Sequence, residues 1–281
     1  DHRDLHSFPT RRSSDLISYI YMNKKSYNIA VVSDPLYKYG GAERHLKYVL
    51  ETFNQDTLFT AYCDREFVSK HFPNIKVKTS LMQYLPWKLQ LRYLYQLLQP
   101  LAYKSFRFKG YDGVVSLSIS FAKFVSSRLP HINICMSPPK FFWEKDGRTL
   151  MEDMQLRGVN RYLYRFYSFF MDTILEDIWK RWDRGAARQV TSMISISSVV
   201  AKRVKKYYGI DSDVIYPPVE VKEIGKLTKG IKRENWFLYL GRIESYKGVE
   251  LAIRAAYDSK SPIKLLLTPP FPAEAFLLFL P

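Results

Sequence analysis

The chain has 281 residues, of which 47% are hydrophobic and 25% charged, so it is long enough to form two globular domains with cores of their own. Its two cysteines could form at most one disulfide bond, which is too few to stabilise a chain of this length, and they lack the neighbouring ligands of a zinc site. The net charge of +16 favours acidic partners, but the basic residues are spread out without a nucleic-acid-binding tail, and no segment has the roughly 18 apolar residues of a membrane span.

Residues 1–16 show neither the helical nor the strand period, and their sequence HSFPTRRSSDL resembles a translated sequencing adapter. We therefore expect this stretch to be non-native and exclude it from the fold; the alternative is a native disordered arm. The polar, charged start is also unlike a signal peptide. The stretch contains as many Asp as Arg residues, so the net charge stays at +16 without it.

The first strand is predicted at residues 27–34 (YNIAVVSD), a short β-branched run typical of a buried parallel strand. A loop with Gly40 and Gly41 follows, and then a helix whose apolar residues share one face: Ala42, Leu46, Val49, Leu50 and Phe53. Further strands are predicted at residues 57–63, 111–118, 131–137, 192–197 and 213–216. Further helices are predicted at residues 88–106, at about 160–190, and after Ser197 or Ser198, one of which is the candidate N-cap.

In the long predicted helix an apolar residue recurs at every fourth position: Tyr162, Phe166, Phe170, Ile174, Ile178, Trp182, Ala186 and Val190. A spacing of four against the helical period of about 3.6 makes this stripe drift around the helix, which predicts a bend or a break. Trp182 and Asp183 are expected to anchor this helix in the core rather than to touch a substrate.

Residues 219–234 contain few large apolar side chains and are predicted to be a linker. A second unit follows, with a strand at 236–240, a loop at 241–246, a helix at 247–257 and a strand at 263–267. This alternation predicts a doubly wound α/β architecture with two Rossmann-like domains, at residues 17–218 and 235–281. The proline-rich tail cannot continue a sheet, so we expect the second domain to be incomplete.

Two glycine-containing turns are the candidate ligand sites. The first is GGAER at residues 40–44, where backbone N–H groups can approach a ligand and the helix N-terminus favours an anion. The alternative is a tight turn chosen for its conformation alone. The second begins at Gly241 and carries Arg242 and Lys247, two cations that suit a diphosphate at a helix N-terminus. The alternative there is a solvated basic loop.

Taken together, the segments GGAER, SISSVVAKRVKKYYGIDSDVIYPPVEV and FLYLGRIESYKGVELAIRAA resemble glycosyltransferase family 4, whose members have the retaining GT-B fold. The segments YDGVVSLSISFAKFV, NICMSPPKFFWE and KRWDRGAARQV resemble the branch that contains O-antigen mannosyltransferases. The resemblance extends over about residues 27–266. It implies transfer of a hexose, mannose by this branch, from a nucleotide sugar such as GDP-mannose to a glycan or lipid-linked acceptor in cell-surface polysaccharide synthesis.

By motif match, the resemblance implies that Arg242 and Lys247 are the catalytic cations that stabilise the leaving diphosphate. The implied donor- and acceptor-binding residues are Gly40, Gly41, Glu43, Ser137 and Gly241. No metal and no further cofactor is implied. The implied location is the cytoplasm, with peripheral contact at the inner face of the membrane.

Two departures from the family pattern affect activity. Where the branch has a histidine that faces the donor sugar, this chain has Met136, which cannot donate a hydrogen bond. The Glu-containing donor motif is absent because the chain ends first, so we expect the recorded chain to be inactive and its full-length parent to be the candidate enzyme.

For two further regions, and for the function itself, the sequence allows alternative interpretations. Near the end of the predicted strand at 111–118, four polar residues either line a cleft or form a polar loop: Ser116, Ser118, Ser120 and Lys123. Residues 87–109 form either a solvated helix face or a membrane contact through Lys88, Arg92, Lys104 and Arg107. The competing functions are a non-catalytic sugar-nucleotide binder and a basic nucleic-acid-binding protein, although no recognition motif for nucleic acid is visible. An NAD-type enzyme is disfavoured because no GxGxxG follows the first strand.

Overall fold

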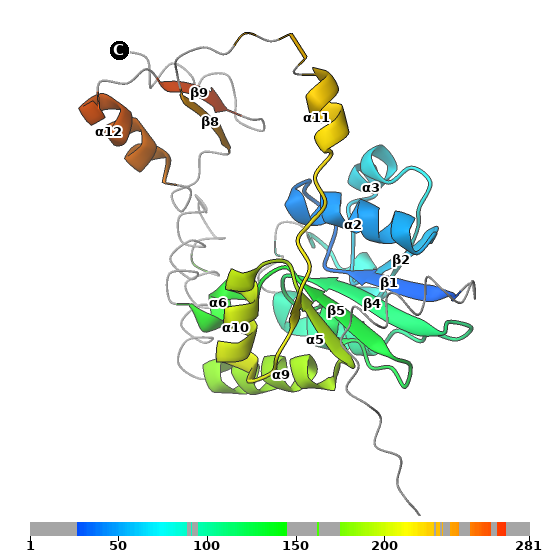
Figure 1. Cartoon of the computed structure of the whole chain (residues 1–281). Helices are drawn as coiled ribbons and strands as arrows, with labels where there is room; N and C mark the ends of the chain where they lie inside the picture. The colour runs from blue at the N-terminus through cyan, green and yellow to red at the C-terminus, as the bar shows by residue number, and fades with distance from the viewer. Residues whose placement is uncertain are drawn as a thin grey trace, which may run out of the picture. The chain divides into compact units, whose positions relative to one another are not determined.

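The computed structural model describes residues 27–88, 91, 95–144, 162, 175–227, 229–230, 232, 237–241, 248–259 and 263–267. The described residues fall into two compact units, the first ending at Pro218 and the second beginning at Val219 (Figure 1). The stretch 1–16 that we exclude, and most of the first half of the predicted helix at 160–190, lie outside the described residues.

A parallel sheet of seven strands forms the centre of the first unit, in the order β3-β2-β1-β4-β5-β6-β7. The strands are β1 (Ile29–Ser33), β2 (Thr57–Thr60), β3 (Lys76–Thr79), β4 (Gly113–Ser118), β5 (His131–Cys135), β6 (Ser192–Ser195) and β7 (Asp213–Val214). In the register, Val31 of β1 lies between Leu58 of β2 and Val115 of β4. The central strands are buried on both faces, which explains why they appear in the sequence as short apolar runs.

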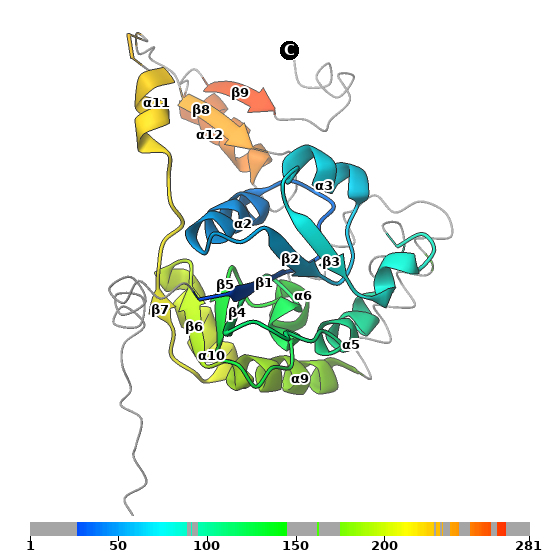
Figure 2. The same ribbon diagram turned by 90° about the vertical axis from the view of Figure 1, so that its right-hand side faces the viewer.

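Helices cover both faces of this sheet (Figure 2). One face carries α2 (Gly41–Thr52) and α3 (Arg65–His71), and the other carries α5 (Gln99–Lys104), α6 (Lys140–Trp143), α9 (Glu176–Gln189) and α10 (Ser198–Tyr208). Three short 3-10 helices complete the unit: η1 (Leu81–Tyr84), η2 (Gln96–Leu98) and η3 (Ala122–Phe124). Leu46, Val49 and Leu50 of α2 pack into the core over the sheet, as predicted. The doubly wound α/β architecture is therefore confirmed.

In the second unit, β8 (Phe237–Gly241) and β9 (Ile263–Leu267) pair in parallel, and α12 (Val249–Ser259) connects them. The segment predicted to be a linker contains the helix α11 (Val221–Leu227). Its described side chains are exposed, so local helix formers such as Lys and Glu, rather than an apolar stripe, account for it. Because the segment has no apolar stripe, its sequence pattern did not predict this helix.

In the described part of the predicted long helix, the apolar stripe is buried only toward its end, at Ala186. Within α9, Trp179 and Asp183 are buried, whereas Ile178 and Trp182 are 44% and 48% exposed. Trp179, Asp183 and Ala187 are each offset by one position, about 100° around the helix, from the stripe residues that the sequence suggested. Asp183 is an anchor as expected, but Trp182 is not; its ring lies at the surface with the Lys104 ammonium 5.7 Å from its centre.

The predicted N-cap of α10 is confirmed at Ser197. Its hydroxyl oxygen accepts a hydrogen bond from the backbone N–H of Val200 at 3.2 Å, so one of the otherwise unpaired N–H groups of the first turn is satisfied. At the other end, Gly209 has a φ of 72°, the left-handed conformation in which helices commonly terminate. Both ends of α10 are therefore specified by local sequence.

Candidate active site

The sheet reverses its winding between β1 and β4, which are neighbours in space. The chain leaves β1 toward α2 on one face (Figure 2), and it leaves β4 toward η3, which contacts α5 and α9 on the opposite face. Ligands of open α/β sheets bind at the carboxyl end of the strands where such a reversal occurs. This edge of the first unit is therefore the place where its candidate ligand-binding residues should gather.

Asp34, the residue directly after β1, ties the two loops of this edge together. One of its carboxylate oxygens accepts hydrogen bonds from the N–H groups of Ile119 and Ser120 at 2.6 and 2.7 Å. The other accepts from Phe121 and Ala122 at 2.9 and 2.8 Å. Four hydrogen bonds to one charged group fix the loop after β4 against the loop after β1. Sequence analysis missed this residue, although an acidic residue at the end of a buried strand was its signal.

The turn at Gly40 and Gly41 lies at the start of α2, at this same edge. Gly40 is the N-cap with φ −161° and ψ −159°, and no side chain caps the helix. Gly41 is the first helical residue, and a methyl group added to it would meet no atom of the described residues beyond its own stretch of helix within 4 Å. Neither glycine has a positive φ, so any residue could adopt these conformations. The explanation by turn conformation alone therefore fails for this pair.

Glu43 lies in the first turn of the same helix and is half-buried. One of its carboxylate oxygens is 3.4 Å from where a methyl group on Gly40 would lie. A carboxylate beside a helix N-terminus interacts favourably with the helix dipole. The preceding loop presents two partly exposed rings, with Tyr37 stacked on Tyr62 and Tyr39 stacked on His71. The N-terminus of α2 is thus bordered by aromatic and carboxylate groups.

Ser137 and Met136 follow β5 at the carboxyl edge of the sheet. The backbone N–H of Met136 donates to the carbonyl of Ser118 at 2.9 Å, which continues the ladder between β4 and β5. The Met136 side chain is partly buried and packs against the core cluster that contains Val31 and Val115. The Ser137 hydroxyl donates to the carbonyl of Pro138 at 3.0 Å. Met136 is therefore integrated into apolar packing.

The sequence left open whether the polar residues around β4 line a cleft or form a polar loop. The structure places three of them in the interior instead. Ser116 and Ser118 are buried in the sheet, where the Asn133 amide donates to their hydroxyl oxygens at 2.8 and 2.9 Å. Lys123 is also buried, and its ammonium lies 2.6 Å from a carboxylate oxygen of Asp183. These three side chains hold the interior together and do not line a cleft.

The buried ring of His131 makes the stability of the first unit depend on pH. Its Nε2 lies 2.7 Å from the Ser116 hydroxyl, and burial lowers its pKa from 6.5 to about 4. The stabilisation from the neutral ring is complete above pH 6.5 and is lost as the pH falls toward 4, because the unfolded chain binds the proton first. We expect the wild type to lose about 2 kcal/mol more than His131→Gln between pH 7 and pH 5.

Urea unfolding of both variants at the two pH values measures this difference. His71→Gln, at a partly exposed ring, is the control for replacing an imidazole and should follow the wild type. Equal pH dependence of the wild type and His131→Gln would show that His131 titrates normally in the folded chain.

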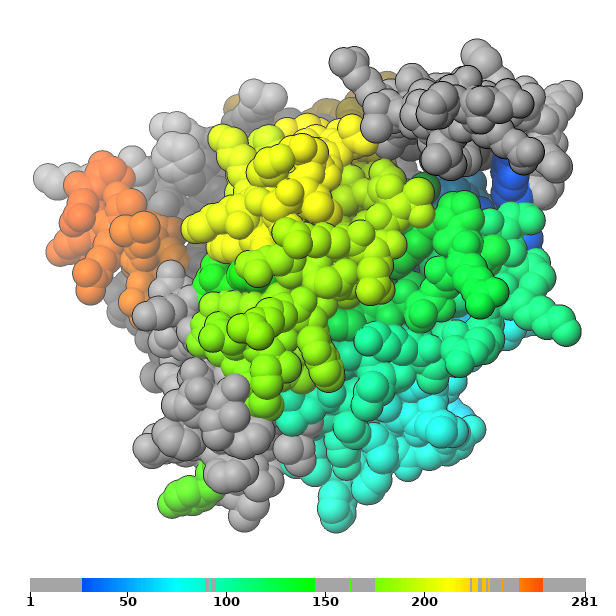
Figure 3. Space-filling model, turned by 90° about the horizontal axis from the view of Figure 1, so that it is seen from below, coloured from blue at the N-terminus to red at the C-terminus, as the bar shows by residue number. Residues whose placement is uncertain are grey.

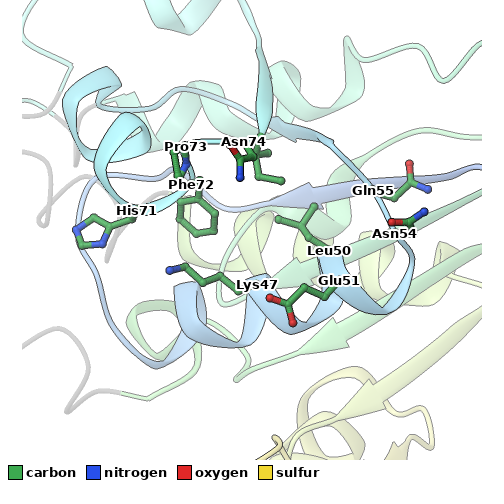
Figure 4. Close-up of a pocket in the computed structure, with 10 residues that line it drawn as sticks. Lys47, Leu50, Glu51, Asn54, Gln55, His71, Phe72, Pro73 and Asn74 are labelled. Carbon is green, nitrogen blue, oxygen red and sulfur yellow. The ribbon is translucent and has the colours of Figure 1, made fainter.

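A surface pocket lies beside α2, between this helix and the turn after α3 (Figure 4). It is lined by Lys47, Leu50, Glu51, Asn54, Gln55, His71, Phe72, Pro73, Asn74 and Ile75. The sequence-predicted site residues are not among them. The pocket is therefore separate from the glycine turn at the start of the helix.

The second predicted turn is described only in part. Gly241 ends β8, and α12 begins at Val249, but Arg242 and Lys247 lie outside the described residues. Within the ranges that the structure describes, no three His, Cys, Asp or Glu side chains are grouped so that they could hold a metal ion. No helix among those residues is both long and apolar enough to span a bilayer.

No protein-family model matches the chain, and no curated protein matches it. Among solved structures, the chain is similar to Anabaena Alr3699/HepE in complex with UDP and glucose, with a TM-score of 0.47 and 15% sequence identity. This similarity covers 86% of the present chain and 60% of HepE. A second HepE structure, in complex with UDP, has a TM-score of 0.43 and 14% identity, covering 82% of this chain and 57% of HepE.

A sucrose-phosphate synthase structure from Thermosynechococcus elongatus is also similar, with a TM-score of 0.34 and 12% identity. Here the similarity covers 70% of this chain and 97% of the other. The present chain thus spans less than two thirds of HepE. At TM-scores this low, the likeness establishes neither a shared family nor a shared activity.

Proposed function

We propose that this chain belongs to a retaining GT-B glycosyltransferase that moves a hexose from a nucleotide sugar to a glycan or lipid-linked acceptor. The ordered motifs that resemble glycosyltransferase family 4 support this proposal, and the branch resemblance favours mannose, GDP-mannose as donor and a role in cell-surface polysaccharide synthesis. The enzyme would work in the cytoplasm, without a metal and without nucleic acid as a partner. Residues 17–218 would form the acceptor-side domain and residues 235–281 part of the donor-binding domain.

The single observation that carries the proposal is the N-terminus of α2, where the N-cap Gly40 has no side chain to cap the helix. Gly40 and Gly41 lie where the sheet reverses its winding, yet neither the backbone conformation nor the packing of the described residues around Gly41 requires glycine. A ligand that approaches the backbone closely would require it. The N–H groups of an uncapped helix turn favour an anion, and the diphosphate of a nucleotide sugar is such a group.

The proposed chemistry places positive charge where negative charge grows as the glycosidic bond breaks. Arg242 and Lys247 would stabilise the departing nucleotide diphosphate, and Gly241 would let the backbone approach it. From the first unit, Gly40 and Gly41 would offer backbone N–H groups. Glu43 and Ser137, at the same sheet edge, would contact the transferred sugar or the acceptor hydroxyl.

Gly41→Ala separates a ligand-contact role from a folding role. Alanine has a better helix propensity and would meet no neighbour, so the free energy of unfolding should stay unchanged or rise by up to about 1 kcal/mol. The added methyl group should nevertheless weaken nucleotide-sugar binding about tenfold or more, because it blocks the backbone from the ligand. Urea unfolding and calorimetric titration with GDP-mannose and UDP-glucose measure the two effects.

Gly185→Ala is the matched control, since Gly185 lies within α9 and a methyl group there also meets no atom within 4 Å. It should leave nucleotide-sugar affinity unchanged. If Gly41→Ala bound the donor as well as the wild type, the start of α2 would not be part of the donor site.

The second candidate function is a sugar-nucleotide binder without transferase activity, which Met136 favours. The branch has histidine at this position, and here the methionine side chain packs against the core cluster. Titrating the protein with GDP and UDP sugars separates the two candidates, since binding with turnover supports the enzyme and binding without turnover supports the binder. Gain of turnover by Met136→His would identify the substitution as the cause.

A further inference from the structure

The surface pocket between the second half of α2 and the turn after α3 has a volume of about 330 Å³ (Figure 4). Cavities of this size are typical of small-molecule sites. Two of its lining residues, Gln55 and Asn74, lie just before β2 and β3, so the pocket reaches the amino ends of these strands. The glycine turn at the start of α2 lies at the carboxyl edge of the sheet. The pocket is therefore separate from the proposed nucleotide-sugar site.

One end of the pocket carries a positioned cation. The Lys47 ammonium lies 5.3 Å from the ring centre of Tyr39 and 5.5 Å from that of Phe72, so two aromatic rings hold it by cation–π contacts. Within the part of the chain that the structure describes, no carboxylate forms an ion pair with it, not even Glu51 one helical turn away. The charge of Lys47 is therefore fixed in place but not neutralised.

The His71 ring lies at the same end of the pocket as Lys47 (Figure 4). It is stacked on the Tyr39 ring with 4.6 Å between their centres, and the Phe67 ring packs against it at 4.7 Å. These contacts restrict the imidazole, while neither of its nitrogens is hydrogen-bonded to a described residue. Lys47 and His71 thus provide two positioned polar groups that an anionic group of a ligand can use.

Side-chain amides line the rest of the pocket. Gln55 donates from Nε2 to the carbonyl of Phe53 at 2.9 Å, which leaves its own side-chain oxygen as an acceptor. The amides of Asn54 and Asn74 form no hydrogen bond with any residue that the structure describes. Each amide can both donate and accept, which suits hydroxyl groups. Phe72 is only 3% exposed and offers no open face on which a nucleobase could stack, so the lining favours a hydroxylated ligand.

We propose that this pocket binds a small polyhydroxylated anion, namely a sugar that bears one carboxylate or phosphate group. The anionic group would lie at Lys47 and His71, because an ammonium without a counter-charge gains a charge-assisted hydrogen bond from it. The hydroxyl groups would pair with the amides of Asn54 and Asn74. Glu51, an exposed lining residue, would repel a second anionic group, so the ligand carries one. The proposal does not depend on the transferase activity.

Calorimetric titration with glucuronate, glucose-6-phosphate, glucose and inorganic phosphate tests the ligand class. The two anionic sugars should bind with a dissociation constant of about 1 mM, as expected for ligands of their size. Glucose and inorganic phosphate should bind about tenfold more weakly, because each lacks one half of the recognised groups. The tighter of the two anionic sugars identifies carboxylate or phosphate as the preferred group. Equal affinity for inorganic phosphate or for glucose would overturn the proposal.

Substitutions locate the site. Lys47→Gln should weaken binding of both anionic sugars about tenfold, whereas Lys47→Arg should keep most of the affinity. Asn74→Ala should weaken binding about threefold to tenfold through the loss of an uncharged hydrogen bond. The matched control is Lys202→Gln on α10, which with α9 covers the other face of the sheet (yellow and yellow-green in Figure 3). This control should bind as the wild type does, and circular dichroism confirms the fold of each variant.

A spectroscopic readout separates this pocket from the start of α2. The imidazole proton signals of His71, assigned by their absence in His71→Gln, should shift when glucuronate is added to the wild type. The same shift should occur in Gly41→Ala, which alters only the proposed nucleotide-sugar site. If glucuronate binding were lost in Gly41→Ala but kept in Lys47→Gln, the ligand would occupy the start of α2, and the proposal for the pocket would be wrong.

Discussion

Replacing both Arg242 and Lys247 by Ala in a form of the protein that transfers the sugar should lower kcat/KM for the nucleotide sugar by about 10²- to 10³-fold. Under the proposed function these side chains balance charge that appears on the diphosphate only as the glycosidic bond breaks. Their removal should therefore lower kcat more than it raises KM. Initial rates with GDP-mannose and with UDP-glucose, and calorimetric titration with GDP and UDP, measure the two effects separately.

The matched control replaces Arg181 and Lys202 by Ala, an arginine and a lysine that are exposed on α9 and α10. It removes the same net charge from the protein and should leave both parameters near those of the wild type. Unchanged affinity and turnover in the Arg242 and Lys247 variant would remove the physical basis of the transferase proposal. A loss of affinity without a loss of turnover at saturation would leave a binding role and exclude a catalytic one.

The central strands could be predicted from the sequence because a strand that is buried on both faces appears as a continuous run of apolar residues. The run at residues 27–34 contains β1, and the run at 111–118 contains β4, and every predicted end lies within two residues of the observed one. The edge strand β3 could not be found in this way. Its sequence KVKT has one apolar residue between two lysines, because only one face of it meets the core and the edge needs protection.

Features that depend on partners far away in the chain could not be predicted from the sequence. Asp34 acts through four backbone N–H groups more than eighty residues away, and backbone groups leave no mark in side-chain patterns. The buried face of α9 depends on what packs there, so Trp179 and Trp182 could not be distinguished by periodicity. For Gly40 and Gly41 the sequence left conformation and ligand contact as alternatives, and only the backbone angles could decide against the first.

The largest effect on stability is expected from the buried ion pair between Lys123 and Asp183. The two side chains are 2% and 0% exposed, and the ammonium lies 2.6 Å from one carboxylate oxygen. The other carboxylate oxygen accepts a hydrogen bond from the indole N–H of Trp143 at 2.7 Å, and the ammonium donates to the carbonyl of Ser120 at 2.6 Å. The pair therefore joins η3, α6 and α9, and neither charge can reach water when its partner is removed.

Lys123→Met should lower the free energy of unfolding by about 3–5 kcal/mol, because it leaves the Asp183 carboxylate buried without a counter-charge. Asp183→Asn should cost a similar amount by stranding the ammonium, although the Asn side chain can still accept from Trp143. The double variant buries no charge, so its loss should be well below the sum of the two single losses, with a coupling energy of about 2–4 kcal/mol. Urea unfolding of all four proteins at pH 7 measures this cycle, and additive losses would mean that the two charges do not stabilise each other in the folded chain.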